Sequence, residues 1–278
     1  MPVDACRLIR KMRGGAQAHL IEAADRNFYV VKFLNNPQHR RILVNEWISS
    51  VFLNYLGIST PEVAIVRVTE TFLRDNPEAY FQRGAGRLEI ELGWHFGSRF
   101  PGDPARTAVY DFLPDSLLQR VENLIEFRGA LAFDKWMGNA DSRQAVFFRA
   151  RLKEWIPASD AHGLKMGFVA QMVDNGYVLE GPHWRLIDSP VQGLYFRAAV
   201  YTGVRGLSDF EPWLSRIVQF PEEVVDQAIK QIPPSWLDGD ESAFDDLIGR
   251  LFARRKRVGD LIEACRRGGR VNPFPDWA

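Results

Sequence analysis

The chain has 278 residues, of which 46% are hydrophobic and 25% are charged. This composition is typical of a folded globular protein and excludes a disordered, collagen-like or disulfide-stapled chain. The 35 basic and 35 acidic residues cancel, so no overall charge would concentrate nucleic acid or an anionic membrane around the molecule. The two cysteines, Cys6 and Cys265, are too few for a disulfide framework or a zinc ribbon, which favours a reducing compartment.

The sequence shows neither a membrane span nor a secretion signal. The longest stretch without a charged residue covers 47–61 and is shorter than the ~20 apolar residues that cross a bilayer. The first residues do not show a basic patch followed by an apolar run. We therefore expect a cytoplasmic protein that does not bind a membrane.

The first third of the chain predicts strands. Gly14-Gly15 and the polar turn at 25–27 separate short runs in the pattern of an antiparallel meander. A helix is predicted over 42–56, because apolar residues recur there at three- and four-residue steps and Gly57 follows. We predict strands at 7–13, 18–23, 27–34, 62–68, 94–100 and 108–112.

The second half of the chain favours helices. The stretches 75–86 and 152–165 are polar enough to be loops or insertions. A strand-rich half followed by a helix-rich half predicts an α+β protein with two lobes, an N-terminal lobe over 1–114 and a helical C-terminal lobe over 115–278. We predict helices at 117–137, 210–220, 221–231 and 242–267, and strands at 145–150 and 167–173.

Lys32 stands out in the strand 27–34, which is apolar on both faces. A Lys buried in such a strand needs an anionic partner, unless the strand lies at a sheet edge and the side chain extends to water. Glu46 follows 14 residues later in the predicted helix and could turn inward to meet Lys32. A solvated position on the helix surface is the alternative for Glu46.

Gly14-Gly15 lies between two predicted strands, shortly before Lys32. Glycines at such a turn let main-chain N–H groups approach phosphate oxygens without a Cβ in the way. The pair matches neither GxGxxG nor a Walker A motif, so an ordinary hairpin turn is the alternative.

Two further segments carry carboxylates. Asn139 follows Gly138 at the end of the predicted helix, and Asp141 and Gln144 lie on the loop after it. The carboxylate of Asp141 and the side-chain carbonyl oxygens of Asn139 and Gln144 suit proton acceptance and the binding of hard cations. Asp174 follows the apolar strand 167–173, where it could hold a divalent metal ion. Polar turns are the alternative for both segments.

The order of these residues is that of the parts used in kinase-type phosphoryl transfer. In this order the chain resembles the HipA-like kinases, within the wider group of protein-kinase-like and phosphoinositide-kinase-like folds. The blocks that carry the resemblance are 11–17, 29–33, 43–47, 133–141 and 173–176.

The resemblance implies a bilobal protein-kinase-like fold and an ATP- and Mg²⁺-dependent phosphotransferase. It implies that Asp141 is the catalytic base and that Asp174 is a metal ligand. It also implies that Lys32 contacts the phosphates and pairs with Glu46. The residues expected to bind the nucleotide are Gly14, Gly15, Ala16, Gln17 and Lys32.

The chain departs from the family pattern after Asp141. Kinases of this type usually place an Asn five residues later, and Val146 stands there and cannot coordinate a metal. Gln144 or Asn139 would supply a carbonyl oxygen instead, and Gln144 is preferred because it follows Asp141 on the same loop. The loop 13–19 contains no hydroxyl residue, so the self-phosphorylation that silences toxin members of the family should be absent.

The leading hypothesis is therefore a kinase acting on a protein Ser or Thr. Val146 motivates a nucleotide-binding pseudokinase scaffold as an alternative, and Asp174-Asn175-Gly176 motivates a lipid or small-molecule kinase. The basic run 254–257 has acidic neighbours, which favours a solvated helix face over a nucleic-acid groove. The expected partners are ATP and a phosphoacceptor protein. The resemblance implies an antitoxin-like protein as a further candidate partner.

Overall fold

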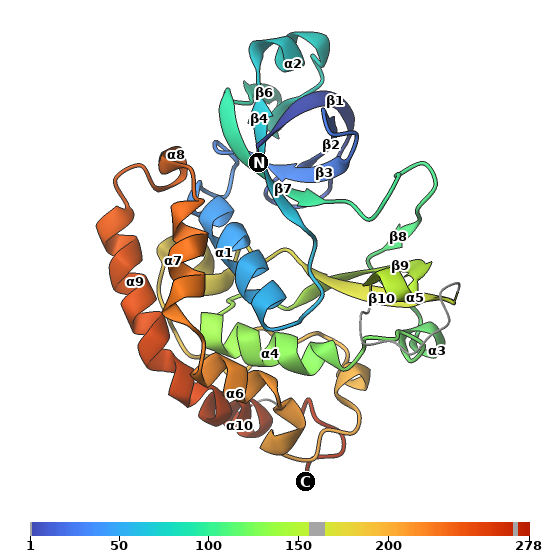
Figure 1. Ribbon diagram of the computed structural model, residues 1–278, viewed down its shortest axis with the longest axis vertical. Coiled ribbons are helices and arrows are strands. Elements are labelled where there is room, and N and C mark those ends of the chain that lie inside the picture. Colours follow the sequence, from blue (N-terminus) through green and yellow to red (C-terminus); the bar gives the residue numbers. More distant parts are fainter. Residues whose placement is uncertain (1, 156–164, 269–271) are drawn as a thin grey trace.

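A small barrel of strands lies above a larger group of helices, and a second small sheet lies between them (Figure 1). The computed structural model describes residues 2–155, 165–268 and 272–278. The strand-rich N-terminal part and the helical C-terminal part follow each other along the chain as expected. The junction expected at residue 114 remains a prediction.

Five strands of the N-terminal part form a closed barrel in the order β1-β2-β3-β7-β4. All neighbours are antiparallel except β1 and β4, which are parallel. The elements of this part are β1 (Val3–Lys11), β2 (His19–Ala23), β3 (Phe28–Lys32), α1 (Arg41–Tyr55), β4 (Val63–Val68), α2 (Glu70–Asp75), β5 (Tyr80–Arg83), β6 (Gly86–Glu89) and β7 (Gly93–Arg99).

Apolar side chains that alternate along the strands fill the barrel. Ile21, Val31 and Val66 are fully buried there, beside Phe33 just after β3. The stretch 75–86, expected to be a loop or an insertion, contains β5 and the turn into β6. Phe81 of β5 is buried against the barrel, so this hairpin gains the apolar packing that its polar composition does not suggest.

The C-terminal part begins with short strands and continues as helices. Its three-stranded sheet has the order β10-β9-β8. The elements of this part are β8 (Val109–Tyr110), α3 (Asp115–Leu118), α4 (Glu126–Met137), β9 (Gln144–Arg151), α5 (Leu152–Trp155), β10 (Met166–Val173), the 3-10 helices η1 (Val178–His183), η2 (Ala198–Tyr201) and η3 (Leu207–Phe210), α6 (Trp213–Val218), α7 (Glu222–Lys230), α8 (Pro234–Leu237), α9 (Glu241–Arg254), the 3-10 helix η4 (Arg255–Arg257) and α10 (Val258–Gly268).

The expected continuous helix 117–137 is broken between α3 and α4. Val121 bridges to Phe168 of β10, and Asn123 exchanges hydrogen bonds of 2.8 and 2.9 Å with the backbone of Ala170. These tertiary bonds outcompete helical propensity. The stretch 152–165, expected to be a loop or an insertion, begins with α5, and 156–164 lie outside the described residues.

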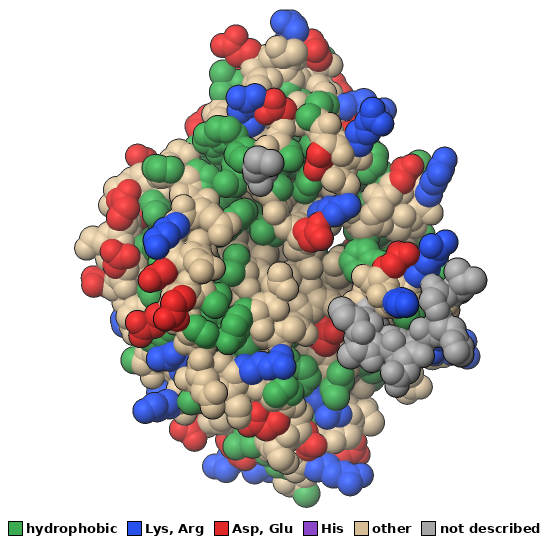
Figure 2. Space-filling model, viewed as in Figure 1, with side chains coloured by type: hydrophobic (Ala, Val, Ile, Leu, Met, Phe, Trp, Pro, Cys, Tyr) green, Lys and Arg blue, Asp and Glu red, His purple; other side chains and the backbone are tan. Residues whose placement is uncertain are grey.

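The basic run 254–257 is not simply a solvated face. The Arg254 side chain is 5% exposed and pairs with Asp188, while Arg255 donates a 2.8 Å hydrogen bond to the carbonyl of Phe220. On the face in Figure 2, basic and acidic side chains are interspersed. Among the described residues, no helix is long and apolar enough to cross a membrane.

Helix α1 packs into the core of the C-terminal part, although it follows the first barrel strands in the chain (Figure 1). Its residues 42–50 are all buried. Trp47 Nε1 donates to the carbonyl of Ala228 in α7 at 3.1 Å. The helix therefore connects the two parts. Its burial fixes the position of the side chains that it directs into the space between them.

His95 of β7 supports the barrel from inside. Its ring is fully buried, with Nδ1 accepting from the N–H of Leu34 at 2.9 Å and Nε2 donating to the carbonyl of Glu91 at 3.0 Å. The neutral ring satisfies both bonds. A second proton would leave the Leu34 N–H without its acceptor.

We expect His95 to make stability depend on pH between about pH 4 and 6.5. Burial lowers the pKa of His95 to about 4, whereas an unfolded chain titrates near ~6.5. In this interval the unfolded chain binds the proton and the folded chain does not. The contribution of His95 to the stability of the fold is therefore complete above pH ~6.5 and is lost as the pH falls towards 4. Chemical unfolding at pH 7 and at pH 4 measures this effect. From pH 7 to pH 4, the free energy of unfolding of the unaltered chain should fall by about 3 kcal/mol more than that of His95→Gln. Equal losses would contradict this account.

Candidate functional site

A cleft opens between the barrel and the sheet of β9 and β10. Its cavity of about 280 Å³ is close to the lower end of the roughly 300–1,000 Å³ range of small-molecule sites. The loop 12–18, the end of β3 and two residues of α1, Glu46 and Ser50, line it, together with residues at the end of β10 and just after it. The predicted site residues that line the cleft are Gly14, Gly15, Ala16, Gln17, Lys32, Glu46, Gln144 and Asp174.

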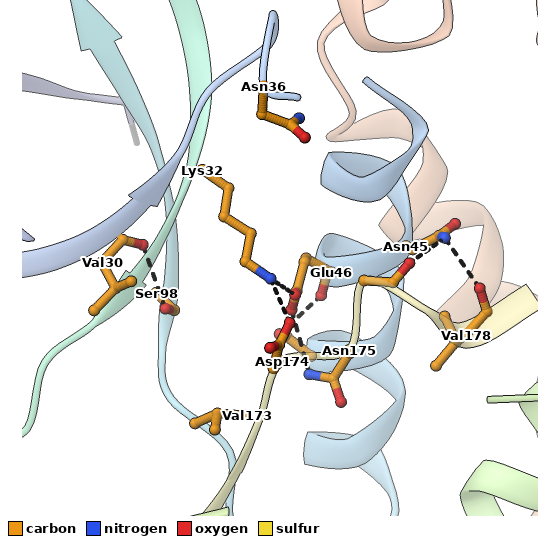
Figure 3. A network of polar contacts seen from close by, with 12 residues as sticks. Val30, Lys32, Asn36, Asn45, Glu46, Ser98, Val173, Asp174, Asn175 and Val178 are labelled. Atoms are coloured by element: carbon orange, nitrogen blue, oxygen red, sulfur yellow. Dashed lines mark hydrogen bonds and ion pairs between the residues drawn. The ribbon is translucent and has the colours of Figure 1, made fainter. Parts of the chain in front are cut away.

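Lys32 ends β3 and points into the cleft (Figure 3). Because side chains alternate along a strand, Val31 faces the barrel core and Lys32 faces the other way. Strand β3 lies between β2 and β7, so the alternative of an edge strand is wrong. Lys32 is 9% exposed, and its Nζ donates to Glu46 and, at 2.7 Å, to Asp174 Oδ1.

The ammonium of Lys32 stays charged despite its burial. Burial alone would lower the pKa of Lys32, but the charges of Glu46 and Asp174 outweigh it and raise the pKa above its ordinary value. The cleft therefore contains a fixed positive charge at neutral pH. One positive and two negative groups meet there within hydrogen-bond distance.

Glu46 is held inside by the burial of α1. It is 3% exposed, so the alternative of a solvated helix position is wrong. Its second carboxylate oxygen accepts from Asn175 Nδ2 at 3.5 Å. Polar atoms buried in this way need hydrogen-bond partners, and Lys32 and Asn175 supply them.

Asp174 leaves β10 in a left-handed backbone conformation, with φ of 56°. Asp tolerates this region better than most residues, and such positions occur at functional sites. Its side chain is 44% exposed, unlike that of Glu46. The charge of Lys32 lowers the pKa of Asp174, so the carboxylate is ionised and still accessible from the cleft.

The loop after α4 places Asp141 and Asn139 differently. Asp141 is exposed, and its Oδ1 accepts from the N–H of Ser142 at 2.8 Å. Asn139 is 1% exposed, and its amide bonds to the N–H of Asp141 and to Asp134. Neither Asp141 nor Asn139 is among the residues that line the cleft.

Gln144 and Val146 of β9 do reach the cleft. Gln144 is exposed and pairs in register with Val173, the residue before Asp174. Strand pairing thus places Gln144 beside the residue that precedes Asp174. The Asn139 amide is instead hydrogen-bonded to Asp134 and to the N–H of Asp141.

Gln171 of β10 is a cleft residue that sequence reasoning missed. It is 4% exposed, and within the described part of the chain its Oε1 has no hydrogen-bond partner. A buried acceptor without a partner is costly, so a ligand donor in the cleft would satisfy it. The signal was available, because Gln171 is a lone polar residue in an apolar strand, as Lys32 is.

The donor atoms at the cleft fit one kind of metal ion. Among residues 2–155, 165–268 and 272–278, no group of three or more His, Cys, Asp or Glu could hold a metal by itself. Asp174 and Gln144 offer one carboxylate and one amide oxygen. This set suits Mg²⁺, which takes its remaining ligands from phosphates and water, and does not suit a structural zinc ion.

Removing the Lys32 side chain should destabilise the fold unless Glu46 is neutralised as well. Lys32→Met leaves a buried carboxylate without its cation, which costs about 3–5 kcal/mol. The double variant Lys32→Met/Glu46→Gln should recover most of this loss. Urea unfolding measures both changes, and Arg7→Met, in an exposed pair with Glu22, serves as the control with a loss of about 0–1 kcal/mol. A double variant no more stable than Lys32→Met would contradict the pairing.

Comparisons with known proteins identify a family and a fold. The model of the HipA-like kinase family matches residues 6–146, from β1 through the glycine loop, Lys32 and Glu46 to β9. A search of the curated proteins finds no match. The crystal structure of the Golgi casein kinase with Mn/ADP bound is similar in fold, with a TM-score of 0.50 and 11% identity, covering 96% of this chain and 73% of that chain.

This structural likeness confirms the expected kinase fold. The family model spans half of the chain and includes most of the residues that line the cleft. The expected resemblance is thereby confirmed. The chain belongs to the HipA-like kinase family.

Proposed function

We propose that the chain is an ATP- and Mg²⁺-dependent kinase that transfers the γ-phosphate to the hydroxyl of a protein Ser or Thr. The observation that carries this proposal is the charged Lys32, which Glu46 and Asp174 hold in a cleft that the loop 12–18 also lines. A buried ammonium beside an accessible carboxylate suits a ligand that brings both phosphates and a metal ion.

The loop at Gly14 supports phosphate binding. Gly14 has φ of 120°, which side-chain-bearing residues rarely adopt, and the space where a Cβ would stand is open. Phosphate oxygens can therefore approach the loop backbone closely. Gln171 also lines the cleft, and its Oε1, which has no partner among the described residues, would accept a hydrogen bond from the amino group of the base.

The proposed reaction assigns each polar group one task. The acceptor oxygen forms a bond to the γ-phosphorus, the bond from that phosphorus to the bridging oxygen breaks, and ADP leaves with the electron pair. Asp141 takes the proton of the hydroxyl, and its exposure leaves room for a protein acceptor. Lys32 neutralises phosphate charge. Asp174 and Gln144 would hold Mg²⁺, which when bound neutralises the charge on the phosphates.

A protein acceptor is favoured over a lipid by the charge distribution. The chain has no net charge, and both signs are mixed on the face in Figure 2. Anionic membranes attract clustered Lys and Arg.

One observation favours a second candidate, a nucleotide-binding pseudokinase. Val146 lines the cleft at the position where kinases of this type usually have a metal-binding Asn. If Gln144 does not replace that ligand, the cleft would bind nucleotide without transferring phosphate.

The first test is calorimetric titration with ATP, with and without Mg²⁺. Asp174→Ala should weaken binding by about tenfold or more when Mg²⁺ is present, a change of about 1.4 kcal/mol. Without Mg²⁺ it should not weaken binding, since it removes a negative charge near the phosphates. Asp75→Ala removes an exposed carboxylate of α2 and should change neither. Metal-independent binding would favour the pseudokinase, and no binding at all would reject both candidates.

The second test is transfer of labelled γ-phosphate to proteins of a cell lysate. Asp141→Asn should reduce transfer by about 10²–10⁴-fold, because the general base is lost. ATP affinity should stay unchanged, and Asp75→Asn is the matched control. Full transfer by Asp141→Asn would remove that residue from its role. Label found in a lipid extract and absent from protein would reject the protein acceptor.

A further inference from the structure

We infer that the buried ion pair of Asp134 and Arg143 fixes the two loops of the cleft relative to each other, and that Arg143 is a positioning residue. One loop carries Asp141 and the other carries Asp174. The inference rests on the proposed function for its kinetic readout, but it concerns residues to which that proposal gives no task. Three sets of contacts meet at the pair.

The pair itself is fully enclosed. Asp134 of α4 is 0% exposed and Arg143 is 1% exposed. Arg143 Nε donates to Asp134 Oδ2 at 2.8 Å, and Nη2 donates to Oδ1 of the same carboxylate. Burial would lower the pKa of Arg143, but the charge of Asp134 outweighs it and raises the pKa. Such pairs often contribute no more stability than apolar residues of the same size, so their specific geometry needs another reason.

The first set of contacts runs from Arg143 to both sides of Asp174. Arg143 Nη1 donates to the carbonyl of Val173 at 3.2 Å and to Asn175 Oδ1 at 2.7 Å. Asn175 in turn donates to Glu46 (Figure 3). The residues before and after Asp174 are therefore held by one guanidinium, which keeps the left-handed turn in place.

The second set runs from Asp134 to Asp141. Asp134 Oδ1 accepts from Asn139 Nδ2 at 2.9 Å, and Asn139 Oδ1 accepts from the N–H of Asp141 at 3.2 Å. Polar contacts thus lead without interruption from Glu46 through Arg143 to Asp141.

The third set comes from the segment 193–194. The N–H of Gly193 donates to the carbonyl of Asp141 at 3.0 Å, and the N–H of Arg143 donates to the carbonyl of Leu194 at 3.1 Å. Gly193 has φ of 69°, and a Cβ there would lie 2.1 Å from Asp134 Cβ. The segment is therefore pressed onto the ion pair, and no side chain fits between them.

These contacts require Arg and not merely a positive charge. A guanidinium presents five N–H groups in a rigid planar fork, and here it serves acceptors on Asp134, Val173 and Asn175. A Lys ammonium is a compact point donor and cannot hold the carboxylate bidentately while reaching both flanks of Asp174. Arg143→Lys therefore keeps the charge and loses the geometry.

Hydrogen exchange tests the inference without any ligand. In Arg143→Lys, the amides of 139–143 and those of 173–176 should exchange faster together. The matched control is Arg254→Lys, which alters another buried Arg, whose partner is Asp188, and neither of these residues lines the cleft. Faster exchange in only one loop, or the same change in both variants, would overturn the inference. This measurement stands even if the unaltered chain binds no nucleotide, a result that would reject only the proposed function.

Metal binding and kinetics provide the second readout. Arg143→Lys should weaken binding of Mn²⁺ in the presence of ADP, followed by electron paramagnetic resonance, by roughly 10–100-fold. It should lower kcat for transfer of the γ-phosphate, measured at saturating ATP and Mg²⁺, by about 100-fold, because the reacting groups are misplaced. Arg254→Lys should match the unaltered chain. Unchanged Mn²⁺ affinity and kcat in Arg143→Lys would overturn the inference.

Asn139→Ala provides an independent variant that cuts the contacts on one side only. It should speed exchange at 139–143 and lower kcat, while leaving exchange at 173–176 and Mn²⁺ affinity as they were. This directional result separates positioning from a general loss of stability. A loss of Mn²⁺ affinity in Asn139→Ala would contradict the assigned contacts and return Asn139 to the metal.

Discussion

The buried ammonium of Lys32 is the constraint on which the arrangement of the cleft depends. Its charge is tolerable only because Glu46 and Asp174 approach it within hydrogen-bond distance. Glu46 can do so only if α1 turns a carboxylate inward, and α1 does this by being buried along most of its length. The helix consequently belongs to the core of the C-terminal part while serving a strand of the barrel.

The two carboxylates around Lys32 differ in a way that suits different tasks. Glu46 is shielded from solvent and accepts a hydrogen bond from Asn175 as well as from Lys32, so its role is to stabilise the fold. Asp174 is half-exposed and stands at a left-handed turn, so one of its oxygens remains available. An interaction partner that displaces Lys32 from Asp174 would leave the Lys32–Glu46 pair intact.

Features that depend on the local sequence pattern could be predicted, whereas features that depend on contacts between distant segments could not. The strands of the barrel and α1 follow local periodicity, and they lie within a few residues of their expected bounds. Lys32 was recognisable because it interrupts an apolar strand, and Gln171 carried the same signal. The break before α4 was not predictable, because it depends on hydrogen bonds from Asn123 to β10. The partners of Arg143 were not predictable either, since they come from three separate segments of the chain.

The closure of the barrel has a consequence for how this chain meets other chains. A strand at the edge of an open sheet presents unpaired N–H and C=O groups that can recruit a further strand. In the ring β1-β2-β3-β7-β4 each strand has a neighbour on both sides, and the parallel pairing of β1 with β4 completes it. Wherever the barrel strands are paired on both sides, they are protected against edge-to-edge aggregation, and contact with another protein there must use side chains and not backbone pairing.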